Sequence, residues 1–135
     1  MDYQDLLKQH KLKVTVQRVS LLKLVDQYEH IDIDTLFENM KKIFPSISLS
    51  TLYKNINAML ENNLLSELKI TAMKSKFEIT KKPHYHAICR KCGKIEEFYF
   101  DIDTIRDNLQ KDSNYHITNT CVIFLGLCQH CKNKK

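Results

Sequence analysis

The sequence predicts an α+β fold in two domains, spanning residues 1–82 and 83–135. Three observations lead to this prediction. The first eighty residues contain three segments with apolar residues at helical spacing, followed by two short runs typical of a β-hairpin. After Pro83 the pattern changes to short strand-like runs around two Cys-x-x-Cys pairs. Only two glycines and two prolines occur, so the breaks between segments are easy to place.

Each of the three helical segments begins at a side chain that can accept a hydrogen bond from the first turn of the helix. In the first segment Val19, Leu22 and Val25 share one face, as expected of a helix that covers a core. The predicted helices are Thr15–Tyr28 capped by Thr15, a helix capped by Asp32 or Asp34 that stops at Pro45, and Thr51–Asn62 capped by Ser50.

Strand-like runs over Leu64–Ile70 and Lys76–Thr80 follow the third helix. Three helices and a β-hairpin make a winged helix, an order typical of DNA-binding domains. Five basic residues and no acidic one lie between Leu6 and Val25. Such a run is either a solvated helix face or a surface that contacts phosphates.

The C-terminal part is predicted to be a separate α+β domain. Two strands flank the first cysteine pair, and an apolar strand leads into the second. The predicted elements are the strands His84–Ile88 and Ile95–Phe100, the helix Ile102–Leu109 and the strand Thr120–Leu127.

Composition narrows the functional classes. A chain of 135 residues with 43% hydrophobic residues can bury a core, and its net charge of +5 does not by itself identify a nucleic-acid partner. No apolar run approaches the ~20 residues of a membrane-spanning helix. The polar segment from Met1 to His10 is unlike a secretory signal, so we expect a cytoplasmic protein.

The spacing of the cysteines predicts a zinc site. Cys89-Arg-Lys-Cys92 and Cys128-Gln-His-Cys131 each allow both sulfurs to reach one metal, and four thiolates form a closed tetrahedral Zn²⁺ site without a position for catalysis. Gly93 is expected to supply a left-handed turn after the first pair. The alternative, a thiol oxidoreductase, needs only one pair, and the zinc deaminase signature is missing. Cys121 is interpreted as a small core residue.

Histidines and carboxylates suggest a second metal site. His84 and His86 share one face of a strand because side chains alternate. Glu78 points off the hydrophobic side of the hairpin, Glu97 lies on the next strand, and His30 ends the first helix. Nitrogen and oxygen ligands suit Fe²⁺ or Mn²⁺ as well as Zn²⁺. Since these residues come from both predicted domains, one ion would fix the angle between the domains.

Four motifs resemble the ferric uptake regulator (Fur) superfamily from Leu12 to Cys131. The motifs are Lys13-Val-Thr-x-Gln-Arg18, Ser50-Thr-Leu-Tyr-Lys-Asn-Ile56, His84-Tyr-His-Ala-Ile-Cys-x-x-Cys-Gly93 and Gly126-x-Cys-x-x-Cys131. The resemblance implies a dimer formed through the C-terminal dimerisation domain, a structural four-cysteine zinc, and a hinge metal that closes the winged helices onto DNA.

Within the superfamily the chain is most similar to the peroxide regulator (PerR) branch. Iron-uptake repressors often have His-His-Asp-His where this chain has Pro83-His84-Tyr85-His86, and Asn119-Thr120 replaces their histidine pattern near the last strand. However, Glu78 and Glu97 are more similar to the iron repressors, because peroxide regulators usually carry Asp there. An iron-responsive repressor of iron uptake genes therefore remains the alternative. A zinc sensor ranks third, because no extra cysteine lies beside His84.

The resemblance implies a repressor rather than an enzyme, with structural Zn²⁺ and with Fe²⁺ or Mn²⁺ as corepressor (Zn²⁺ can replace them in vitro). Its expected partners are double-stranded operator DNA and a second copy of the chain, with no membrane and no small molecule besides the metal and hydrogen peroxide. With Fe²⁺ bound, peroxide is expected to oxidise His30 or His84. The residues expected at the DNA are Lys13, Gln17, Arg18, Ser50, Thr51, Tyr53, Lys54 and Asn55.

Overall fold

A computed structural model describes the chain except for residues 71–72, 82–84, 100, 118–119 and 134–135. It divides into two compact units, an N-terminal unit (Met1–Thr80) and a C-terminal unit (Lys81–Lys135), which are described separately. Among the described residues, no helix has the length and apolar character needed to cross a membrane.

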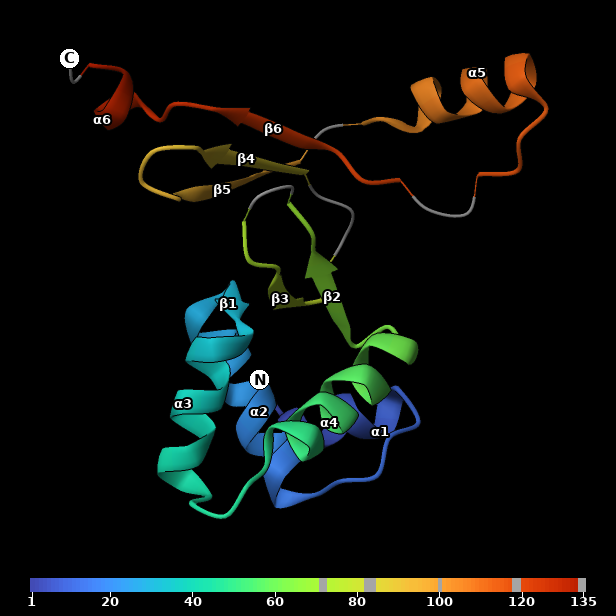
Figure 1. The fold of residues 1–135 in the computed structure, drawn as a ribbon. Coiled ribbons are helices and arrows are strands. Elements are labelled where there is room, and N and C mark those ends of the chain that lie inside the picture. Colours follow the sequence, from blue (N-terminus) through green and yellow to red (C-terminus); the bar gives the residue numbers. More distant parts are fainter. Residues whose placement is uncertain (71–72, 82–84, 100, 118–119, 134–135) are drawn as a thin grey trace. The chain divides into compact units, whose positions relative to one another are not determined.

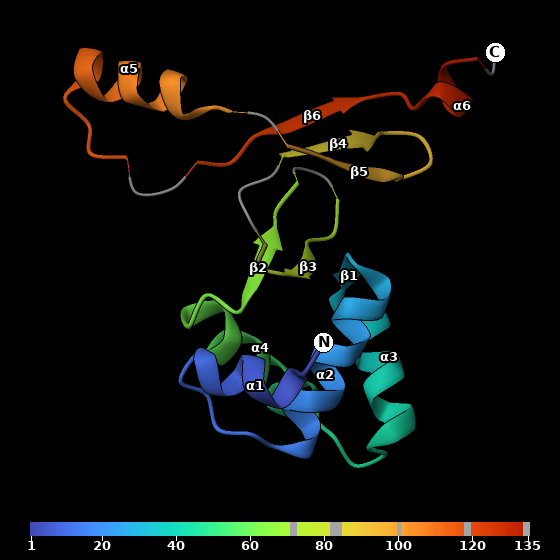
Figure 2. The same cartoon turned by 180° about the vertical axis from the view of Figure 1, so that it is seen from behind.

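The described residues of the N-terminal unit form four helices and a three-stranded antiparallel sheet (Figures 1 and 2). β3 is the central strand, with β1 on one side and β2 on the other. The elements are α1 (Tyr3–Gln9), α2 (Val16–Tyr28), β1 (Ile31–Asp32), α3 (Ile33–Ile43), α4 (Leu49–Glu61), β2 (Leu65–Leu68) and β3 (Lys76–Ile79).

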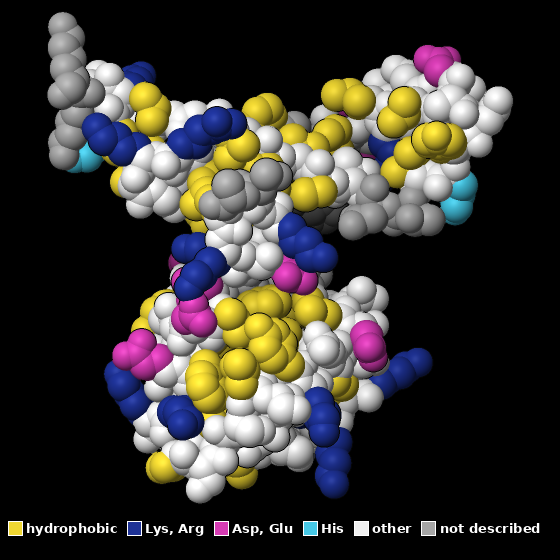
Figure 3. Space-filling view, in the orientation of Figure 1, with side chains coloured by type: hydrophobic (Ala, Val, Ile, Leu, Met, Phe, Trp, Pro, Cys, Tyr) yellow, Lys and Arg dark blue, Asp and Glu magenta, His cyan; other side chains and the backbone are white. Residues whose placement is uncertain are grey.

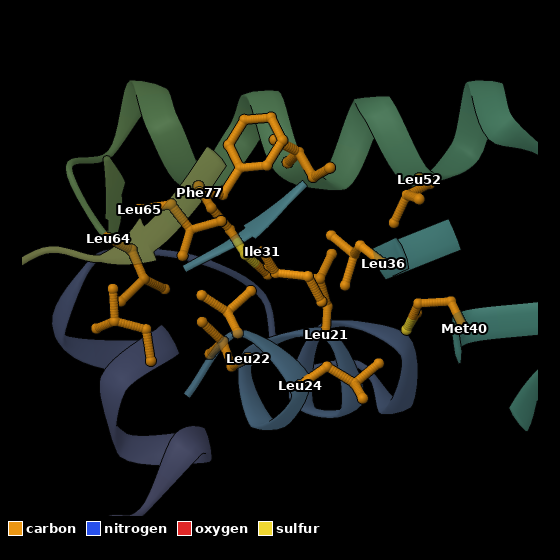
Figure 4. Close-up of a cluster of buried hydrophobic side chains, with 14 of the residues drawn as sticks. Leu21, Leu22, Leu24, Ile31, Leu36, Met40, Leu52, Leu64, Leu65 and Phe77 are labelled. Atoms are coloured by element: carbon orange, nitrogen blue, oxygen red, sulfur yellow. The ribbon is translucent and has the colours of Figure 1, made fainter. Parts of the chain in front are cut away.

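Apolar side chains from all four helices and from the sheet form one buried cluster (Figure 4). Leu22 of α2, Leu36 of α3 and Leu52 of α4 have no exposed surface. Burying a side chain of this size stabilises a fold by about 1.5–3 kcal/mol, so the cluster holds the helices together. Its members are Leu7, Leu21, Leu22, Leu24, Val25, Ile31, Leu36, Met40, Ile47, Leu52, Ile56, Met59, Leu64, Leu65, Phe77 and Ile79.

The caps of the first two predicted helices are confirmed. Thr15 accepts a hydrogen bond from the N–H of Arg18 at 3.2 Å, and α2 follows it. Asp32, rather than Asp34, caps α3 by accepting from the N–H of Thr35 at 2.8 Å.

The predicted cap of the third helix is wrong. α4 is capped by Ser48, whose Oγ accepts from the N–H of Thr51 at 3.1 Å, and not by Ser50. A cap at Ser48 places Ile47 before the helix and Leu52 at its fourth position, and both are buried in the core. Packing between a residue before the cap and the fourth residue of the helix fixes the direction in which the chain enters the helix. A cap at Ser50 would put the half-exposed Leu49, instead of the buried Ile47, in the position before the cap.

The sequence did not predict α1 and β1. Asp2 caps α1 by accepting from the N–H groups of Gln4 and Asp5, and the helix buries Leu7. β1 has two residues, of which Ile31 lies opposite Phe77 of β3. Both elements are too short to show a clear periodicity, so packing against the cluster determines them.

The C-terminal unit contains a second three-stranded sheet (Figure 1). β4 is central, pairing antiparallel with β5 and parallel with β6. The described elements are β4 (Tyr85–Cys89), β5 (Ile95–Phe98), α5 (Asp103–Ser113), β6 (Ile123–Gly126) and α6 (Gln129–Lys132). The sequence predicted neither α6 nor the full length of α5, and the predicted strand start at His84 lies outside the described residues.

The last strand differs most from its prediction. β6 covers only part of the predicted Thr120–Leu127, and Cys121 lies before it with an exposed side chain. The interpretation of Cys121 as a core residue is therefore wrong. An apolar run predicts burial, but β6 is an edge strand whose Phe124 and Leu125 are about half exposed in a single chain.

The C-terminal unit buries few apolar side chains. Among its described residues these are Tyr85, Ile88, Cys89 and Cys131, and α5 buries none. Figure 3 shows hydrophobic side chains gathered at the surface over α5 and the strands. The exposed large apolar residues of this unit are Phe98, Tyr99, Ile105, Leu109, Tyr115, Phe124, Leu125 and Leu127.

Candidate metal centres

The four paired cysteines meet at one point of the C-terminal unit. The sulfur atoms of Cys89, Cys92, Cys128 and Cys131 all lie within 4.8 Å of one another. The Sγ atoms of Cys92 and Cys128 are 3.7 Å apart. Tetrahedral zinc with Zn–S bonds of about 2.3 Å places its sulfurs roughly 3.8 Å apart, so the cluster fits a structural Zn²⁺.

Local backbone geometry brings these sulfurs together. Cys89 ends β4, and the turn that follows it carries Gly93 with φ 79°, as the sequence predicted. The N–H of Gly93 donates to the carbonyl of Cys89 at 2.9 Å and closes the turn. The second pair follows the end of a strand, as predicted: β6 ends at Gly126, Cys128 is the N-cap residue of the short helix α6, and α6 carries Cys131.

Backbone N–H groups favour the thiolate form, which binds metal, at two of the four cysteines. The N–H of Cys92, 3.5 Å from the Cys89 sulfur, and then the backbone of Cys128 lower the pKa of Cys89 to about 5. The backbone of Cys131 likewise lowers the pKa of Cys128. Burial, followed by the neighbouring sulfurs, raises the pKa of Cys131 to about 12. Four adjacent thiolates therefore need a cation, which a bound Zn²⁺ supplies as it displaces the protons.

The N-terminal unit holds a histidine–carboxylate pair. His30 Nε2 lies 2.9 Å from Glu78 Oε2, and the two side chains are 9% and 5% exposed. His30 follows a tight turn in which its N–H donates to the carbonyl of Tyr28 and Glu29 has φ 63°. Glu78 lies on β3 between Phe77 and Ile79, which belong to the hydrophobic cluster, as the alternation predicted.

The C-terminal unit holds a second pair. His86 of β4 and Glu97 of β5 are register partners, so their side chains leave the same face of the sheet. Lys81 Nζ lies 3.2 and 3.4 Å from the two carboxylate oxygens of Glu97, and the Tyr99 hydroxyl donates to Glu97 at 3.4 Å. Neither of these two neighbours was predicted from the sequence. His84, the fifth predicted ligand, lies outside the described residues.

The residues expected at the DNA lie on α2, α4 and the segment before α2. Tyr53 is 40% exposed, and Lys13, Ser50 and Lys54 are exposed. Gln17, Arg18, Thr51 and Asn55 are half-buried. Arg18 donates from Nε to Asn55 Oδ1 and from a terminal nitrogen to the carbonyl of Lys13, each at 3.1 Å.

The model of the ferric uptake regulator family matches residues 9–125 of the chain. The chain belongs to the ferric uptake regulator family. This match spans both units, from the end of α1 to β6, and includes both histidine–carboxylate pairs.

Individual family members are similar along most of the chain. The peroxide-responsive repressor PerR of Staphylococcus saprophyticus is 29% identical over 130 residues, which are 95% of this chain and 88% of that protein. The crystal structure of the Campylobacter jejuni peroxide stress regulator has 35% identity and a TM-score of 0.75, covering 97% of this chain and all of the other. The ferric uptake regulator of Francisella tularensis, solved with iron, has 25% identity, a TM-score of 0.73 and coverage of 90% and 96%.

Family membership and the similarity to these relatives establish the general function of the protein. The ferric uptake regulator family consists of transcriptional regulators, and this member is a metal-dependent transcriptional repressor. The four-cysteine cluster fits its structural zinc, and the histidine–carboxylate pairs are separate from that cluster.

Proposed function

We propose that the protein is a homodimeric, peroxide-responsive repressor that binds operator DNA with Fe²⁺ or Mn²⁺ as corepressor. The observation that carries the proposal is the division of the candidate metal ligands between the units, apart from the zinc cysteines. One histidine–carboxylate pair belongs to the unit with the winged helix and the other to the unit with the zinc cluster. A repressor of this kind acts in the cytoplasm, where its DNA lies.

The distance within the first pair suits a metal site. Two neighbouring ligands of an octahedral ion with bonds of about 2.1 Å are separated by roughly 3.0 Å, close to the 2.9 Å between His30 and Glu78. Imidazole and carboxylate together suit Fe²⁺ and Mn²⁺. The proposed ligands are His30, Glu78, His84, His86 and Glu97, of which His84 is included through the family resemblance.

An ion held by ligands from both units would restrict how the winged helix is oriented. It would shift the population toward a form that binds DNA, because only that form satisfies all of its ligands. In this role the ion controls DNA affinity without taking part in any reaction of the DNA.

The exposed face of α4 supports operator binding. α4 follows a helix–turn–helix arrangement, and its Tyr53 and Lys54 are exposed where a recognition helix reads base edges. Lys13 and Gln17 lie at the start of α2 or just before it, and are proposed to contact the sugar–phosphate backbone or the minor groove. Ser50 and Thr51 in the first turn of α4 complete the proposed surface.

The exposed apolar side chains of the C-terminal unit support a homodimer. Phe124 and Leu125 on β6 and Leu127 after it are 43–54% exposed in the single chain. Contiguous exposed apolar surface on an edge strand is typical of a protein interface. A two-fold dimer would also present two recognition helices to two half-sites of an operator.

Similarity to peroxide regulators supports hydrogen peroxide as the signal. A bound Fe²⁺ would supply the electrons that cleave the O–O bond of hydrogen peroxide, with one oxygen atom passing to a ligand imidazole and the other leaving as water, whereas a bound Mn²⁺ would not. We propose that His30 or His84 then gains an oxygen atom. An oxidised imidazole is a poorer ligand, so DNA affinity would fall.

An iron-responsive repressor of iron uptake genes is the second candidate. The observation that favours it is the pair of glutamates, Glu78 and Glu97, where peroxide regulators usually carry aspartate. The longer side chain of Glu97 would slow a peroxide response, and the similarity to the Francisella tularensis regulator fits this candidate as well.

Operator binding can be tested without knowing the operator. Double-stranded DNA is selected from a random pool with the Mn²⁺-loaded protein, and binding of the selected duplex is then measured while Mn²⁺ is added to metal-free buffer. We expect affinity to rise with Mn²⁺ while one zinc per chain is retained. Equal affinity with and without Mn²⁺ would contradict the proposed sensing role.

Peroxide distinguishes the two candidates. The Fe²⁺ and Mn²⁺ forms are exposed briefly to peroxide, and their peptides are analysed by mass spectrometry. We expect one added oxygen on a peptide that contains His30 or His84 in the Fe²⁺ form only, together with release of DNA. If both peptides stay unmodified while iron still controls DNA binding, the iron-responsive function replaces the peroxide-responsive one.

A further inference from the structure

We propose that Arg18 is a positioning residue that orients the Asn55 amide of α4, so that position 55 presents its amide nitrogen, a hydrogen-bond donor, to operator DNA. This inference rests on the proposed DNA-binding function and deepens it. It assigns the Arg18 side chain a role inside the protein, whereas the sequence predicted that Arg18 itself contacts DNA.

The Arg18 guanidinium joins three segments of the N-terminal unit. Its Nε donates to Asn55 Oδ1 on α4, and a terminal nitrogen donates to the backbone carbonyl of Lys13, both at 3.1 Å. The backbone of Arg18 is fixed as well, because its N–H donates to the cap residue Thr15. Hydrogen bonds from a charged donor are stronger than neutral ones, so these contacts connect α2, α4 and the segment before α2.

The chemistry of arginine determines which way the Asn55 amide faces. A guanidinium only donates hydrogen bonds, so the amide oxygen must face Arg18 and the amide nitrogen must point away from it. Within the part of the chain that the structure describes, Asn55 Nδ2 donates no hydrogen bond. This nitrogen therefore stays available as a donor beside the exposed Tyr53 and Lys54.

This arrangement limits what Asn55 can recognise. Asparagine reads adenine through a bidentate contact in which both its donor and its acceptor face the base, and here the acceptor oxygen is turned toward Arg18. The partners that suit the amide nitrogen are hydrogen-bond acceptors, namely a phosphate oxygen, a purine N7, guanine O6 or thymine O4. The contact to Lys13 adds a second consequence, because it fixes the backbone of a basic residue that is also expected at the DNA.

A direct phosphate contact by Arg18 is the competing role, and a double-mutant cycle separates the two. Affinity for the selected duplex is measured with Mn²⁺ for the wild type, Arg18→Ala, Asn55→Ala and the double variant. If Arg18 acts through Asn55, each single change weakens binding by roughly 5- to 50-fold, the loss typical of one specific contact. The double variant should then bind within about twofold of the weaker single variant.

Two further measurements sharpen the cycle. Asn55→Asp keeps an oxygen for Arg18 but has no donor, so it should bind at least as weakly as Asn55→Ala. Removing a phosphate contact lowers the slope of log affinity against log salt concentration by about 0.9, whereas Arg18→Ala is expected to leave this slope near the wild-type value. Lys23→Ala, an exposed basic residue on the same helix, is the matched control for loss of charge.

The results distinguish a failure of this inference from a failure of the proposed function. If the wild type shows no Mn²⁺-dependent binding of selected DNA, the proposed function and this inference both fall. If the wild type binds but the two single losses multiply in the double variant, or the salt slope falls by about one for Arg18→Ala, Arg18 contacts DNA directly and only this inference is overturned. Circular dichroism and zinc content confirm that each variant is folded.

Discussion

The two units differ in how they are held together. The N-terminal unit surrounds a single cluster of buried apolar side chains drawn from every described helix and from its sheet. The described residues of the C-terminal unit bury only a few apolar side chains, two of which are cysteines of the metal cluster, and several large apolar residues stay exposed. Burial of apolar side chains can therefore stabilise the N-terminal unit by itself. The C-terminal unit buries too few apolar side chains for a unit of its size.

This contrast indicates what completes the C-terminal unit. A structural zinc contributes folding free energy directly, because the site does not exist in the unfolded chain. A second copy would cover the exposed apolar residues of β6. The proposed dimer interface and the zinc site lie in the same unit, so losing either should weaken the other.

The largest expected effect is the removal of a zinc ligand. Cys92→Ser should release the zinc, unfold the C-terminal unit and abolish the dimer, because zinc binding of this kind is worth about 10–16 kcal/mol. The N-terminal unit should keep its helices. Zinc content, size-exclusion chromatography and limited proteolysis measure these three results.

Cys121→Ser is the matched control. Its side chain is exposed and lies outside the cluster, so zinc and dimer should be unchanged. A Cys92→Ser protein that has no zinc yet remains a stable dimer would show that the C-terminal unit does not depend on the metal.

A pair of leucines tests the difference in burial. Leu22→Ala removes a fully buried side chain from the N-terminal cluster and should lower the free energy of unfolding by about 2–5 kcal/mol. Leu125 is 43% exposed, so Leu125→Ala should lower it by less while raising the dissociation constant of the dimer. Chemical denaturation and analytical ultracentrifugation measure the two quantities. If Leu22→Ala and Leu125→Ala lowered the free energy of unfolding equally and the dimer were unchanged, the proposed difference in burial between the units would be contradicted.

The smallest expected effect concerns the start of α4. Ser48→Ala should cost about 1 kcal/mol of stability, because the Ser48 oxygen accepts from the first turn. Ser50→Ala should change the free energy of unfolding by less than about 0.5 kcal/mol, because Ser50 is exposed and does not cap the helix. Thermal unfolding of the two variants gives the comparison, and a larger loss for Ser50→Ala would favour the cap predicted from the sequence.

The sequence was most informative where local chemistry decides the structure. The caps Thr15 and Asp32, the left-handed Gly93 and the paired cysteines follow from neighbours within a few residues. The predictions failed where packing between residues far apart in the sequence determines the structure. Ser48 caps α4 because Ile47 enters the core, and Cys121 is exposed because β6 lies at the edge of the sheet.

Contacts between residues far apart in the sequence could not be predicted either. The hydrogen bond from Arg18 to Asn55 spans 37 positions, and the ion pair between Lys81 and Glu97 spans 16. Patterns of residue types identified Arg18, Asn55 and Glu97 as functional candidates but not Lys81, and such patterns do not show which side chains contact one another.

We propose that the regulatory metal acts through the histidine–carboxylate pairs and not through the zinc cluster. The most direct test compares operator binding of wild type, His86→Ala and the exposed control His116→Ala as Mn²⁺ is added, with zinc measured in each protein. We expect His86→Ala to keep one zinc per chain but to lose the rise in DNA affinity, while His116→Ala behaves as the wild type. A His86→Ala protein with the wild-type Mn²⁺ response and intact zinc would contradict it.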